Sequence, residues 1–571
     1  MNPKWPLRFG VLILAISWWA AAAWAQRPRV EWDPSMPTPG FQPGPEADQV
    51  TPGRFFIDPP TIHNLGFRWY IEGDTNRNAS VAVAYRAKGE TEWLEAQPML
   101  RVQYEVVNRA YQPWRCGNLF AGSVMFLAPG TEYEVRFTMT DPDGGAAPPK
   151  VVTATTRTEP AHFEGERRVA VLPADHEGPR PAGAMELAEA LRQARPGDVL
   201  LLHAGVHRGT FAMETSGRPE RPIVLRAAGD GPAVLEGPDH DSTLLDLRNA
   251  AHVYLENLTF RRARVAVHGG NKGDAGAPGL VVRRCTIEDV VSGIWAYSEN
   301  ARNWFIADNV LVGMNPTWYP RTTPERGYME PSHTGVNVYG QGHVVAFNRI
   351  TRFSDSLAVA NYGPPVDDLE KHCVNIDFYH NDLSWAQDDT VEADYGGHNI
   401  RVYRNRCYNA HTALSVQPSY GGPLYLIRNE AYGITGIAYK LHNYCTGIVA
   451  FHNTTCTAGN GFSSFDRWQN GHFRNNLILG GAGAAIATGS ITPYTTLDYN
   501  GYRRNRPDHF IRWYDGEARH TFESLPEFAE ATGHERHGLE VDYDSFVRAA
   551  PPERGETAEP SDWDLRLRPL S

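Results

Sequence analysis

In the stretch Asn399-Ile400-Arg401-Val402-Tyr403-Arg404-Asn405, a short strand of alternating apolar residues leads to an asparagine, and this pattern decides the fold. The same pattern returns in Gly447-Ile448-Val449-Ala450-Phe451-His452-Asn453. From Asn381 onward the marker asparagine recurs at intervals of 24, 24, 24, 23 and 24 residues. A nearly constant period indicates a stack of structural repeats. The markers are Asn257, Asn309, Asn348, Asn381, Asn405, Asn429, Asn453, Asn476 and Asn500, with Cys285 at the step between the first two.

This period suits one three-strand coil of a right-handed parallel β-helix. Leucine-rich repeats have a similar period, but the Leu-rich consensus that they need is absent. An Asn at the same position of every coil can form a ladder of side-chain amides along the stack, so we assign these residues a structural role. The sequence therefore predicts an all-β protein with a β-helix over residues 165–505. The longer intervals on either side of Asn348 predict insertions at 317–331 and 361–371.

The two ends of the predicted β-helix depart from the repeat. Residues 185–191 form a short amphipathic pattern just before the apolar strand 199–202, which predicts a helix that caps the first coil. Residues 506–571 are expected to form a C-terminal extension. Within it, residues 522–531 have a helical pattern, and residues 562–569 resemble the tail of many secreted β-helix proteins.

Short alternating strands over residues 55–158 predict a small β-sandwich before the β-helix. The stretch Leu127-Ala128-Pro129-Gly130-Thr131-Glu132-Tyr133-Glu134-Val135 resembles the tyrosine corner of fibronectin type III domains, in which a Tyr ties back to the backbone. The sandwich is expected to act as a spacer or lid, with direct carbohydrate binding as the alternative. Residues 26–54 are rich in Pro, Gly and charge, which is typical of a linker.

The N-terminus indicates the compartment. Lys4 and Arg8 precede an apolar run over residues 9–24, and Ala23-Trp24-Ala25 is a small-x-small cleavage motif. This pattern predicts a signal peptide over residues 1–25 and a secreted or periplasmic protein. No other stretch approaches the ~20 apolar residues that span a bilayer, so no membrane insertion is expected.

Composition narrows the range of partners. The chain has 571 residues and a net charge of −12, which argues against nucleic-acid binding but not against an acidic polysaccharide held through a metal ion or a local basic cluster. The six Cys residues are compatible with disulfides in an oxidising compartment, although their pairing cannot be deduced. We expect a monomer.

Counting from the marker Asn residues places distant acids side by side. Asp355 lies seven residues after Asn348, and Asp388 lies seven after Asn381, so the two should be neighbours on adjacent coils. The stretch Asp388-Asp389-Thr390-Val391-Glu392-Ala393-Asp394 holds four acids in seven residues. Such carboxylates repel one another, and Ca²⁺ relieves that repulsion in a flexible oxygen site. We therefore predict a calcium site from Asp355, Asp388, Asp389, Glu392 and Asp394, and the alternative is a solvated acidic turn.

Lys440 shares the register of Glu392, since each lies eleven residues after its marker. Its neighbours in the chain are mostly apolar or aromatic, so partial burial could lower its pKa toward that of a base. The alternative is that Lys440 pairs with an acid on a neighbouring coil. His442 and Arg467 fall on nearby coils and complete the set of candidate catalytic residues.

Asp355, the pair Asp388-Asp389, Glu392 and then Lys440 resemble the pectate lyases of polysaccharide lyase family nine. The resemblance implies that the acids bind Ca²⁺ and that Lys440 is the Brønsted base. Glu392 stands where the family has Asp, and the offset to the Lys is longer here. The capped entry is shared with the alginate and chondroitin lyases of family six, whose catalytic pattern is not evident.

The resemblance implies β-elimination on a uronic-acid-containing polysaccharide. A second hypothesis is an inverting glycoside hydrolase of the polygalacturonase type, with Asp355, Asp388 and Asp389 as acid and base. The Gly-His-Gly and Arg-Ile-Lys motifs that accompany those acids are absent. A C5-epimerase would share the proton abstraction. A non-catalytic carbohydrate-binding or surface protein is a further alternative, since a fold alone does not imply function.

Overall fold

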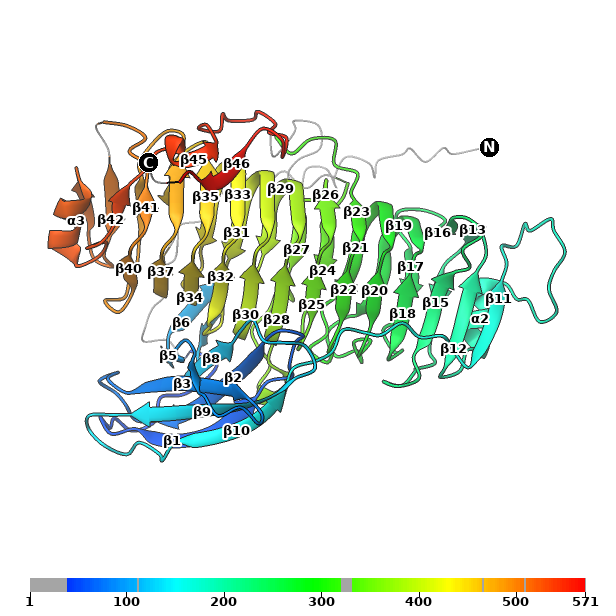
Figure 1. Ribbon diagram of the computed structural model, residues 1–571, viewed down its shortest axis with the longest axis horizontal. Coiled ribbons are helices and arrows are strands. Elements are labelled where there is room, and N and C mark those ends of the chain that lie inside the picture. The colour runs from blue at the N-terminus through cyan, green and yellow to red at the C-terminus, as the bar shows by residue number, and fades with distance from the viewer. Residues whose placement is uncertain (1–37, 110–111, 320–330, 465–466, 508–509, 570–571) are drawn as a thin grey trace, which may run out of the picture.

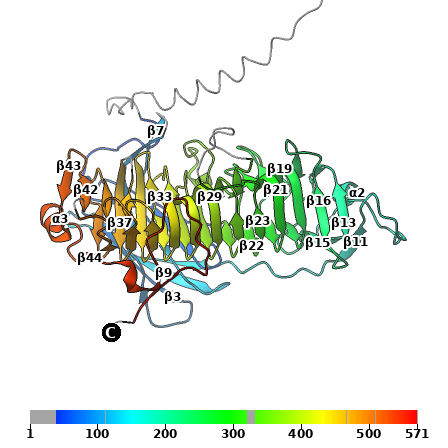
Figure 2. The same ribbon diagram turned by 90° about the horizontal axis from the view of Figure 1, so that it is seen from above.

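The computed structural model describes residues 38–109, 112–319, 331–464, 467–507 and 510–569. It shows one elongated stack of parallel strands with α2 at one end and α3 at the other (Figures 1 and 2). A parallel β-helix preceded by antiparallel sheets confirms the predicted fold class. The predicted signal peptide at 1–25 and most of the first predicted insertion lie outside the described residues.

One side of every coil belongs to a 13-stranded parallel sheet. Its strands alternate core and outer side chains, and the apolar ones meet inside the stack. In chain order the strands are β11 (Arg167–Val171), β12 (Asp198–Leu202), β15 (Ile223–Ala227), β18 (Val253–Glu256), β20 (Val281–Arg283), β22 (Phe305–Ala307), β25 (Val344–Ala346), β28 (Val374–Tyr379), β30 (His398–Tyr403), β32 (Leu424–Ile427), β34 (Cys445–Phe451), β37 (Trp468–Arg474) and β40 (Thr496–Asp498).

The other two sides belong to a 17-stranded sheet. Its long strands bend at a residue in the left-handed region, such as Trp385 (φ 55°), so that one strand serves two sides. The strands are β13 (Gly205–Arg208), β14 (Phe211–Ala212), β16 (Ala233–Glu236), β17 (Thr243–Asp246), β19 (Thr259–Gly270), β21 (Thr286–Ala296), β23 (Val310–Val312), β24 (Thr334–Asn337), β26 (Arg349–Thr351), β27 (Asp355–Ala358), β29 (Asp382–Glu392), β31 (Arg406–Val416), β33 (Glu430–Leu441), β35 (Thr454–Thr457), β38 (Leu477–Gly480), β41 (Gly501–Tyr502) and β44 (Leu539–Glu540).

The predicted asparagine ladder is present between the two sheets. In each step the backbone N–H and Nδ2 of one Asn both donate to Oδ1 of the next, as Asn429 does to Asn453 at 3.0 Å. The carboxylate of Glu535 ends the series, because it accepts from the backbone N–H and Nδ2 of Asn500. The ladder consists of Asn309, Asn348, Asn381, Asn405, Asn429, Asn453, Asn476 and Asn500.

The predicted start of the ladder is partly wrong. Cys285 does lie in the column, since its backbone N–H donates to Oδ1 of Asn309. Asn257, in contrast, is an exposed residue with φ 57°, and Leu258 takes the column position one residue later. A left-handed residue precedes each column position, such as His452 (φ 58°) before Asn453. Asn257 therefore fills the turn, because Asn tolerates that conformation better than most residues.

Both ends of the stack carry a helix. At the first coil, α2 (Leu187–Gln193) buries Leu187, Ala190 and Leu191 against the core, as a capping helix should. At the last coils, α3 (Leu525–Thr532) begins after Ser524, whose hydroxyl accepts from the N–H of Glu527, and it ends at Gly533. Beside it lies a small four-stranded sheet of β36 (Phe462–Ser463), β39 (Ile486–Gly489), β42 (Ile511–Tyr514) and β43 (Arg519–Phe522).

Two four-stranded antiparallel sheets form the N-terminal sandwich around their own apolar core. The hydroxyl of Tyr133 accepts a hydrogen bond from the backbone N–H of Ala128 at 3.0 Å, which is the tie expected from the sequence. One sheet holds β1 (Thr51–Ile57), β2 (Leu65–Glu72), β8 (Asn118–Val124) and β5 (Leu100–Gln103). The other holds β10 (Lys150–Thr155), β9 (Glu132–Thr140), β3 (Ser80–Ala87) and β4 (Leu94–Glu95).

The sandwich packs against the outer face of the 13-stranded sheet (Figure 1). Arg401 on β30 is fully buried at this junction and pairs with Asp377 on β28 at 2.5 Å. Its guanidinium also donates to the hydroxyl of Ser123 on β8 at 2.9 Å. A hairpin of β6 (Val106–Arg109) and β7 (Gln112–Arg115) reaches further, because the N–H of Asn108 donates to the carbonyl of Asn443 after β33.

The C-terminal segment folds back along the coils. A pair of strands, β45 (Phe546–Arg548) and β46 (Asp564–Leu567), packs Trp563 against Tyr432 in a stacked arrangement. Short 3₁₀ turns lie at η1 (Leu369–Lys371), inside the second predicted insertion, and at η2 (Tyr543–Ser545).

All six Cys residues are buried, and the structure joins no two of them in the disulfides with which the sequence is compatible. They pack as small apolar side chains inside the stack. Within the described ranges, none of the helices has both the length and the apolar character of a membrane span.

Candidate functional site

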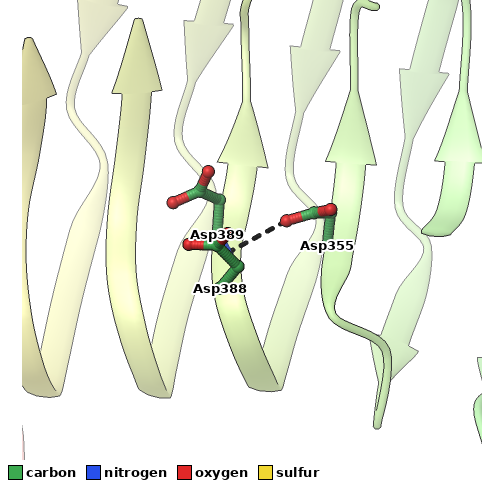
Figure 3. Close-up of side chains that lie close together, drawn as sticks. All are labelled: Asp355, Asp388 and Asp389. Atoms are coloured by element: carbon green, nitrogen blue, oxygen red, sulfur yellow. Dashed lines mark hydrogen bonds between the residues drawn. The ribbon is translucent and has the colours of Figure 1, made fainter. Parts of the chain in front are cut away.

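Three aspartates meet on the 17-stranded sheet (Figure 3). Asp355 begins β27, while Asp388 and Asp389 lie in β29 on the next coil. One carboxylate oxygen from each of the three lies within 4.8 Å of the others. Only 3%, 8% and 0% of these residues is exposed. Counting residues from the marker Asn residues predicted that these aspartates would be neighbours. We use the term acid cluster for the three aspartates together with Glu392.

A β-bulge explains why two consecutive residues supply oxygens to one place. Side chains normally alternate between the two faces of a strand. Between β29 and β31, however, Ala386 pairs with Ala410 and Asp389 pairs with Thr412, so one strand has an extra residue. The backbone N–H of Asp389 also donates to the carboxylate of Asp355 at 3.2 Å. The bulge is a common device for redirecting a side chain next to a functional site.

Lys440 points from β33 toward the acid cluster. The pairing runs from Glu392 to Ser415 and from Ser415 to Lys440, so these residues lie two strands apart as the register predicted. Lys440 Nζ donates to Oδ2 of Asp389 at 2.8 Å and to Oδ1 of Asp388 at 3.2 Å. Of the two alternatives for Lys440, the structure therefore shows the ion pair, although the acids lie two coils away rather than on the neighbouring coil.

The electrostatics of Lys440 correct one expectation. Burial does act to lower its pKa, as the sequence suggested, but Asp389, Asp388 and Asp394 outweigh it, and the pKa of Lys440 is raised. The cause is that all three acids lie near one buried ammonium group. In this arrangement Lys440 is a counter-ion rather than a neutral base.

The buried acids are incompletely satisfied. Burial and then Asp388 raise the pKa of Asp389, although Lys440 acts in the opposite direction. Burial and then Asp355 and Asp394 raise the pKa of Glu392. Among the described residues, Oδ1 of Asp389 and Oε2 of Glu392 have no hydrogen-bond partner. Buried polar atoms of this kind are rare in folded proteins, and they mark a place where a further group fits.

Asp394 is buried beside the acid cluster, and its carboxylate is held by the protein. Its Oδ1 accepts from the N–H of Gln417 at 2.7 Å and from the hydroxyl of Ser415 at 3.1 Å. Among the groups of His/Cys/Asp/Glu that the described coordinates bring together, neither Asp394 nor Glu392 joins the three aspartates. Glu392 differs from Asp394 in that its Oε2 is buried without a hydrogen-bond partner among the described residues, so it can still complete the site. Asp394 contributes charge to the site, since it raises the pKa of both Glu392 and Lys440.

The other two candidate catalytic residues, His442 and Arg467, do not belong to the acid cluster. His442 follows β33, and its backbone N–H donates to the carbonyl of Val416. Arg467 lies one coil later, where its Nη1 donates to the hydroxyl of Tyr444 at 3.1 Å. Arg467 lines a cavity that none of the acid-cluster residues lines.

Sequence reasoning missed an aromatic group on the N-terminal side of the acids. The rings of Tyr297 and Tyr362 meet edge to face at 5.8 Å, and Trp295 meets Tyr297 at 4.8 Å. Burial first, and then the charges of Glu392 and Asp355, raise the pKa of both tyrosines, which places them beside the acid cluster. Trp295 pairs with Asn337, Asn337 with Ala358, and Ala358 with Glu392. Trp295 therefore has the same position in its coil as Glu392, and counting along the coils could have placed it on the same face. Tyr362, by contrast, comes from the second insertion.

The acid cluster fits a hard divalent cation. It offers several carboxylate oxygens within 4.8 Å, and two buried oxygens lack a donor among the described residues. Ca²⁺ accepts six to eight oxygen ligands in flexible geometry, so a mixture of Asp and Glu is suitable. Asp355, Asp388, Asp389 and Glu392 would hold such an ion.

No protein-family model and no curated protein sequence matches the chain. One similar solved structure is a mannuronic-acid-specific polysaccharide family 6 lyase from human gut microbiota, with 14% identity and a TM-score of 0.36 over 66% of this chain and 91% of that chain. A second is the catalytic unit of a GH87 alpha-1,3-glucanase from Streptomyces thermodiastaticus, with 14% identity and a TM-score of 0.36 over 88% and 91%. A third is pectate lyase Pel9A, with 15% identity and a TM-score of 0.26 over 72% and 91%. These values leave the reaction of this chain open.

Proposed function

We propose that this protein is an extracellular lyase that cleaves a uronic-acid-containing polysaccharide by β-elimination. The single observation that carries the proposal is the buried acid cluster on the 17-stranded sheet, with Lys440 Nζ at 2.8 Å from Oδ2 of Asp389. A general base and a set of metal-ligating carboxylates on one surface are what β-elimination next to a carboxylate requires.

In this proposal Asp355, Asp388, Asp389 and Glu392 hold Ca²⁺. Bound there, the ion would neutralise the acids and the uronate carboxylate of the substrate. Lys440 Nζ would accept the proton from C5 of the uronate sugar. The C4–O bond then breaks, and a double bond forms between C4 and C5. The leaving oxygen takes a proton from water, and Lys440 returns the proton from C5 to the solvent. The aromatic rings of Trp295 and Tyr362 would contact neighbouring sugars.

The ion pairs of Lys440 set a condition on this mechanism. A protonated Lys440 bonded to Asp388 and Asp389 has no lone pair with which to accept a proton. Lys440 must therefore leave these acids and lose its proton before the reaction. Binding of positive charge by the acids would favour that change, because it removes the interaction that raises the pKa of Lys440.

A second candidate function has one specific observation in its favour. The raised pKa values of Asp389 and Glu392 are what a general acid needs, since such a group must hold its proton at working pH. An inverting glycoside hydrolase would pair a protonated carboxyl with an ionised one. Its products differ from those of a lyase, because hydrolysis forms no double bond.

One assay separates the two functions. The full chain is incubated with polygalacturonate, alginate and glucuronate-containing polymers, with Ca²⁺ or with a chelator, and the ultraviolet absorbance of unsaturated uronate is followed together with new reducing ends. The lyase proposal predicts calcium-dependent absorbance on at least one polymer. New reducing ends without absorbance would identify a hydrolase, and no change on any polymer would favour a binding protein.

The role of Lys440 has its own test. Lys440→Ala is expected to lower the rate of elimination by at least about a hundredfold, because general-base catalysis contributes that much. Lys88→Ala is the matched control, since Lys88 pairs with Glu132 on the sandwich, away from the acid cluster. Full lyase activity in Lys440→Ala would remove Lys440 from the mechanism.

A further inference from the structure

A cavity of about 720 Å³ lies on the outer surface of the last coils, beyond Lys440. Strands β39, β42 and β43 supply most of its wall. The lining residues that matter here are Ser464, Arg467, Arg512, Tyr514, Glu517 and Arg519. The proposed lyase mechanism uses none of them.

The cavity continues the same face of the β-helix as the acid cluster. Lys440 stands between two core residues of β33, Tyr439 and Leu441, and Arg512 stands in the same way between Ile511 and Trp513. Both side chains therefore project outward. The nearer wall is one coil from Lys440, because the hydroxyl of Ser464 donates to the carbonyl of Leu441 at 2.5 Å.

The distance along the stack follows from the strand order. Strand β36 packs on β33, and Ser463 of β36 pairs with Ala487, which in turn pairs with Arg512. Arg512 is thus three strands beyond Lys440, or about 14 Å at ~4.8 Å per strand. A polymer that lies along the stack with one unit at Lys440 would reach the cavity with a later unit.

Positive charge gathers in this cavity although the chain carries a net charge of −12. Three arginines line it, and Glu517 is the single carboxylate among the described lining residues. Within the described part of the chain, Arg512 and Arg519 form no ion pair. Unpaired guanidinium groups at a concave surface attract anions and concentrate them there.

The third arginine is held in place by two aromatic rings. The guanidinium carbon of Arg467 lies 5.8 Å from the ring centre of Tyr444 and 5.6 Å from that of Tyr514. Its Nη1 donates to the hydroxyl of Tyr444 at 3.1 Å. A planar guanidinium fixed in this way loses little freedom when it binds a carboxylate.

We propose that this cavity is a distal subsite that binds the carboxylate of a uronate unit in the polymer, about three strands beyond the point of cleavage. Arg512 and Arg519 supply the free guanidinium groups, and Arg467 supplies an ordered one. Arginine matches the two oxygens of a carboxylate better than lysine does. The choice of uronate rests on the proposed lyase function, whereas anion binding by the cavity does not.

The test is a calorimetric titration of the full chain with acidic trisaccharides of galacturonate, mannuronate or guluronate. A chelator is present, so that calcium-dependent cleavage cannot consume the ligand. The fully methyl-esterified trigalacturonate is the neutral control. At least one acidic trisaccharide is expected to bind, to bind more weakly as salt is added, and to bind more tightly than the ester. Equal binding of the ester, or no binding of any acidic trisaccharide at millimolar concentration, would overturn the inference.

Substitutions of the lining arginines test whether the trisaccharide binds in this cavity. Arg512→Gln with Arg519→Gln should weaken it by about tenfold or more, since charge-assisted hydrogen bonds are lost. Arg536→Gln removes an exposed arginine that does not line the cavity, so it should leave the affinity unchanged. Wild-type affinity in the double variant would refute the subsite. If binding depends on these arginines but no polymer yields unsaturated products, the lyase proposal fails and the subsite stands.

Discussion

The asparagine ladder and the acid cluster lie on the same coils but satisfy their buried polar groups in opposite ways. Asn381 in the ladder donates from Nδ2 to the carbonyl of Val345 and to Oδ1 of Asn405, and its own Oδ1 accepts from Asn348. Asp389, eight residues later, pairs through Oδ2 with Lys440, while its Oδ1 has no hydrogen-bond partner among the described residues. The polar groups of Asn381 are all hydrogen-bonded within the protein, whereas the carboxylate of Asp389 has room for a further partner.

The difference indicates that one set of positions in this β-helix stabilises the fold, whereas another set is available for binding or catalysis. Ladder positions repeat because, between the two ends of the ladder, each Asn donates to the Asn on the next coil. The acid cluster does not repeat, and its carboxylates raise one another's pKa, which costs folding energy. Groups that are kept despite such a cost are candidates for function.

The largest effect should come from the acid cluster. Asp388→Asn with Asp389→Asn is expected to lower the rate on any cleaved polymer by at least about a hundredfold, because the ligands and the charges around Lys440 are lost. The free energy of unfolding should change by less than about 1 kcal/mol, since the relief of repulsion among the acids offsets the loss of their ion pairs with Lys440. Initial rates and calorimetric unfolding measure the two quantities.

Asp382→Asn is the matched control on the same strand. Asp382 pairs with Arg406 at the surface of the coil, so its loss should leave the rate nearly unchanged. A double variant that unfolds as a destabilised protein would instead give the acids a structural role.

A substitution in the asparagine ladder should lower the stability of the protein, in contrast to one in the acid cluster. Asn453→Ala is expected to destabilise the protein by about 4 kcal/mol, because several buried donors and acceptors lose their partner at once. Denaturant unfolding measures this change. Asn249→Ala, at an exposed position with one bond to Glu214, should cost less than ~0.5 kcal/mol. Equal effects of the two substitutions would show that the ladder is not a source of stability.

The end of the ladder should make stability depend on pH. Burial raises the pKa of Glu535 from 4.5 to about 7, although its bonds to Asn500 and Tyr502 act in the opposite direction. A raised carboxyl pKa in the folded state means that the folded protein binds more protons between pH 4.5 and 7, so stability falls as the pH rises through this range.

Glu535→Gln removes the titration. Relative to the variant, the wild type should lose about 3 kcal/mol of stability between pH 4 and pH 8, since each unit of pKa shift corresponds to about 1.4 kcal/mol. Unfolding curves of both proteins at several pH values measure the difference. A difference that does not vary with pH would contradict the raised pKa.

The smallest effect is expected at the marker that does not join the ladder. Asn257→Gly should change stability by less than about 0.5 kcal/mol, because the side chain is exposed and Gly adopts the left-handed region without strain. Chemical denaturation of this variant beside Asn453→Ala measures how much the ladder position itself contributes. A large loss at Asn257 would mean that the repeat has been assigned one residue out of register.

The fold could be predicted because the ladder requires one residue type at one position of every coil. The period of the Asn residues therefore locates the coils directly, and counting from Asn348 and Asn381 brought Asp355 beside Asp388. Counting works wherever each coil has the same number of residues per side. It placed Asn257 one residue out of register because Asn also suits the left-handed turn that precedes the ladder.

Other parts of the site depend on local geometry that no period encodes. The bulge that brings Asp388 and Asp389 to one place adds a residue within a strand. Tyr362 comes from an insertion, so its position beside Glu392 cannot be counted from a marker. The raised pKa of Lys440 depends on distances to three acids, whereas the sequence shows only that its neighbours are apolar.

The central claim is that the acid cluster is an incomplete site that a divalent cation completes. A calorimetric titration of the full chain with Ca²⁺ tests it most directly, with the Asp388→Asn, Asp389→Asn variant in parallel. The account predicts saturable binding of one equivalent in the wild type and none in the variant. Absence of binding in the wild type, or the same binding in both proteins, would contradict it.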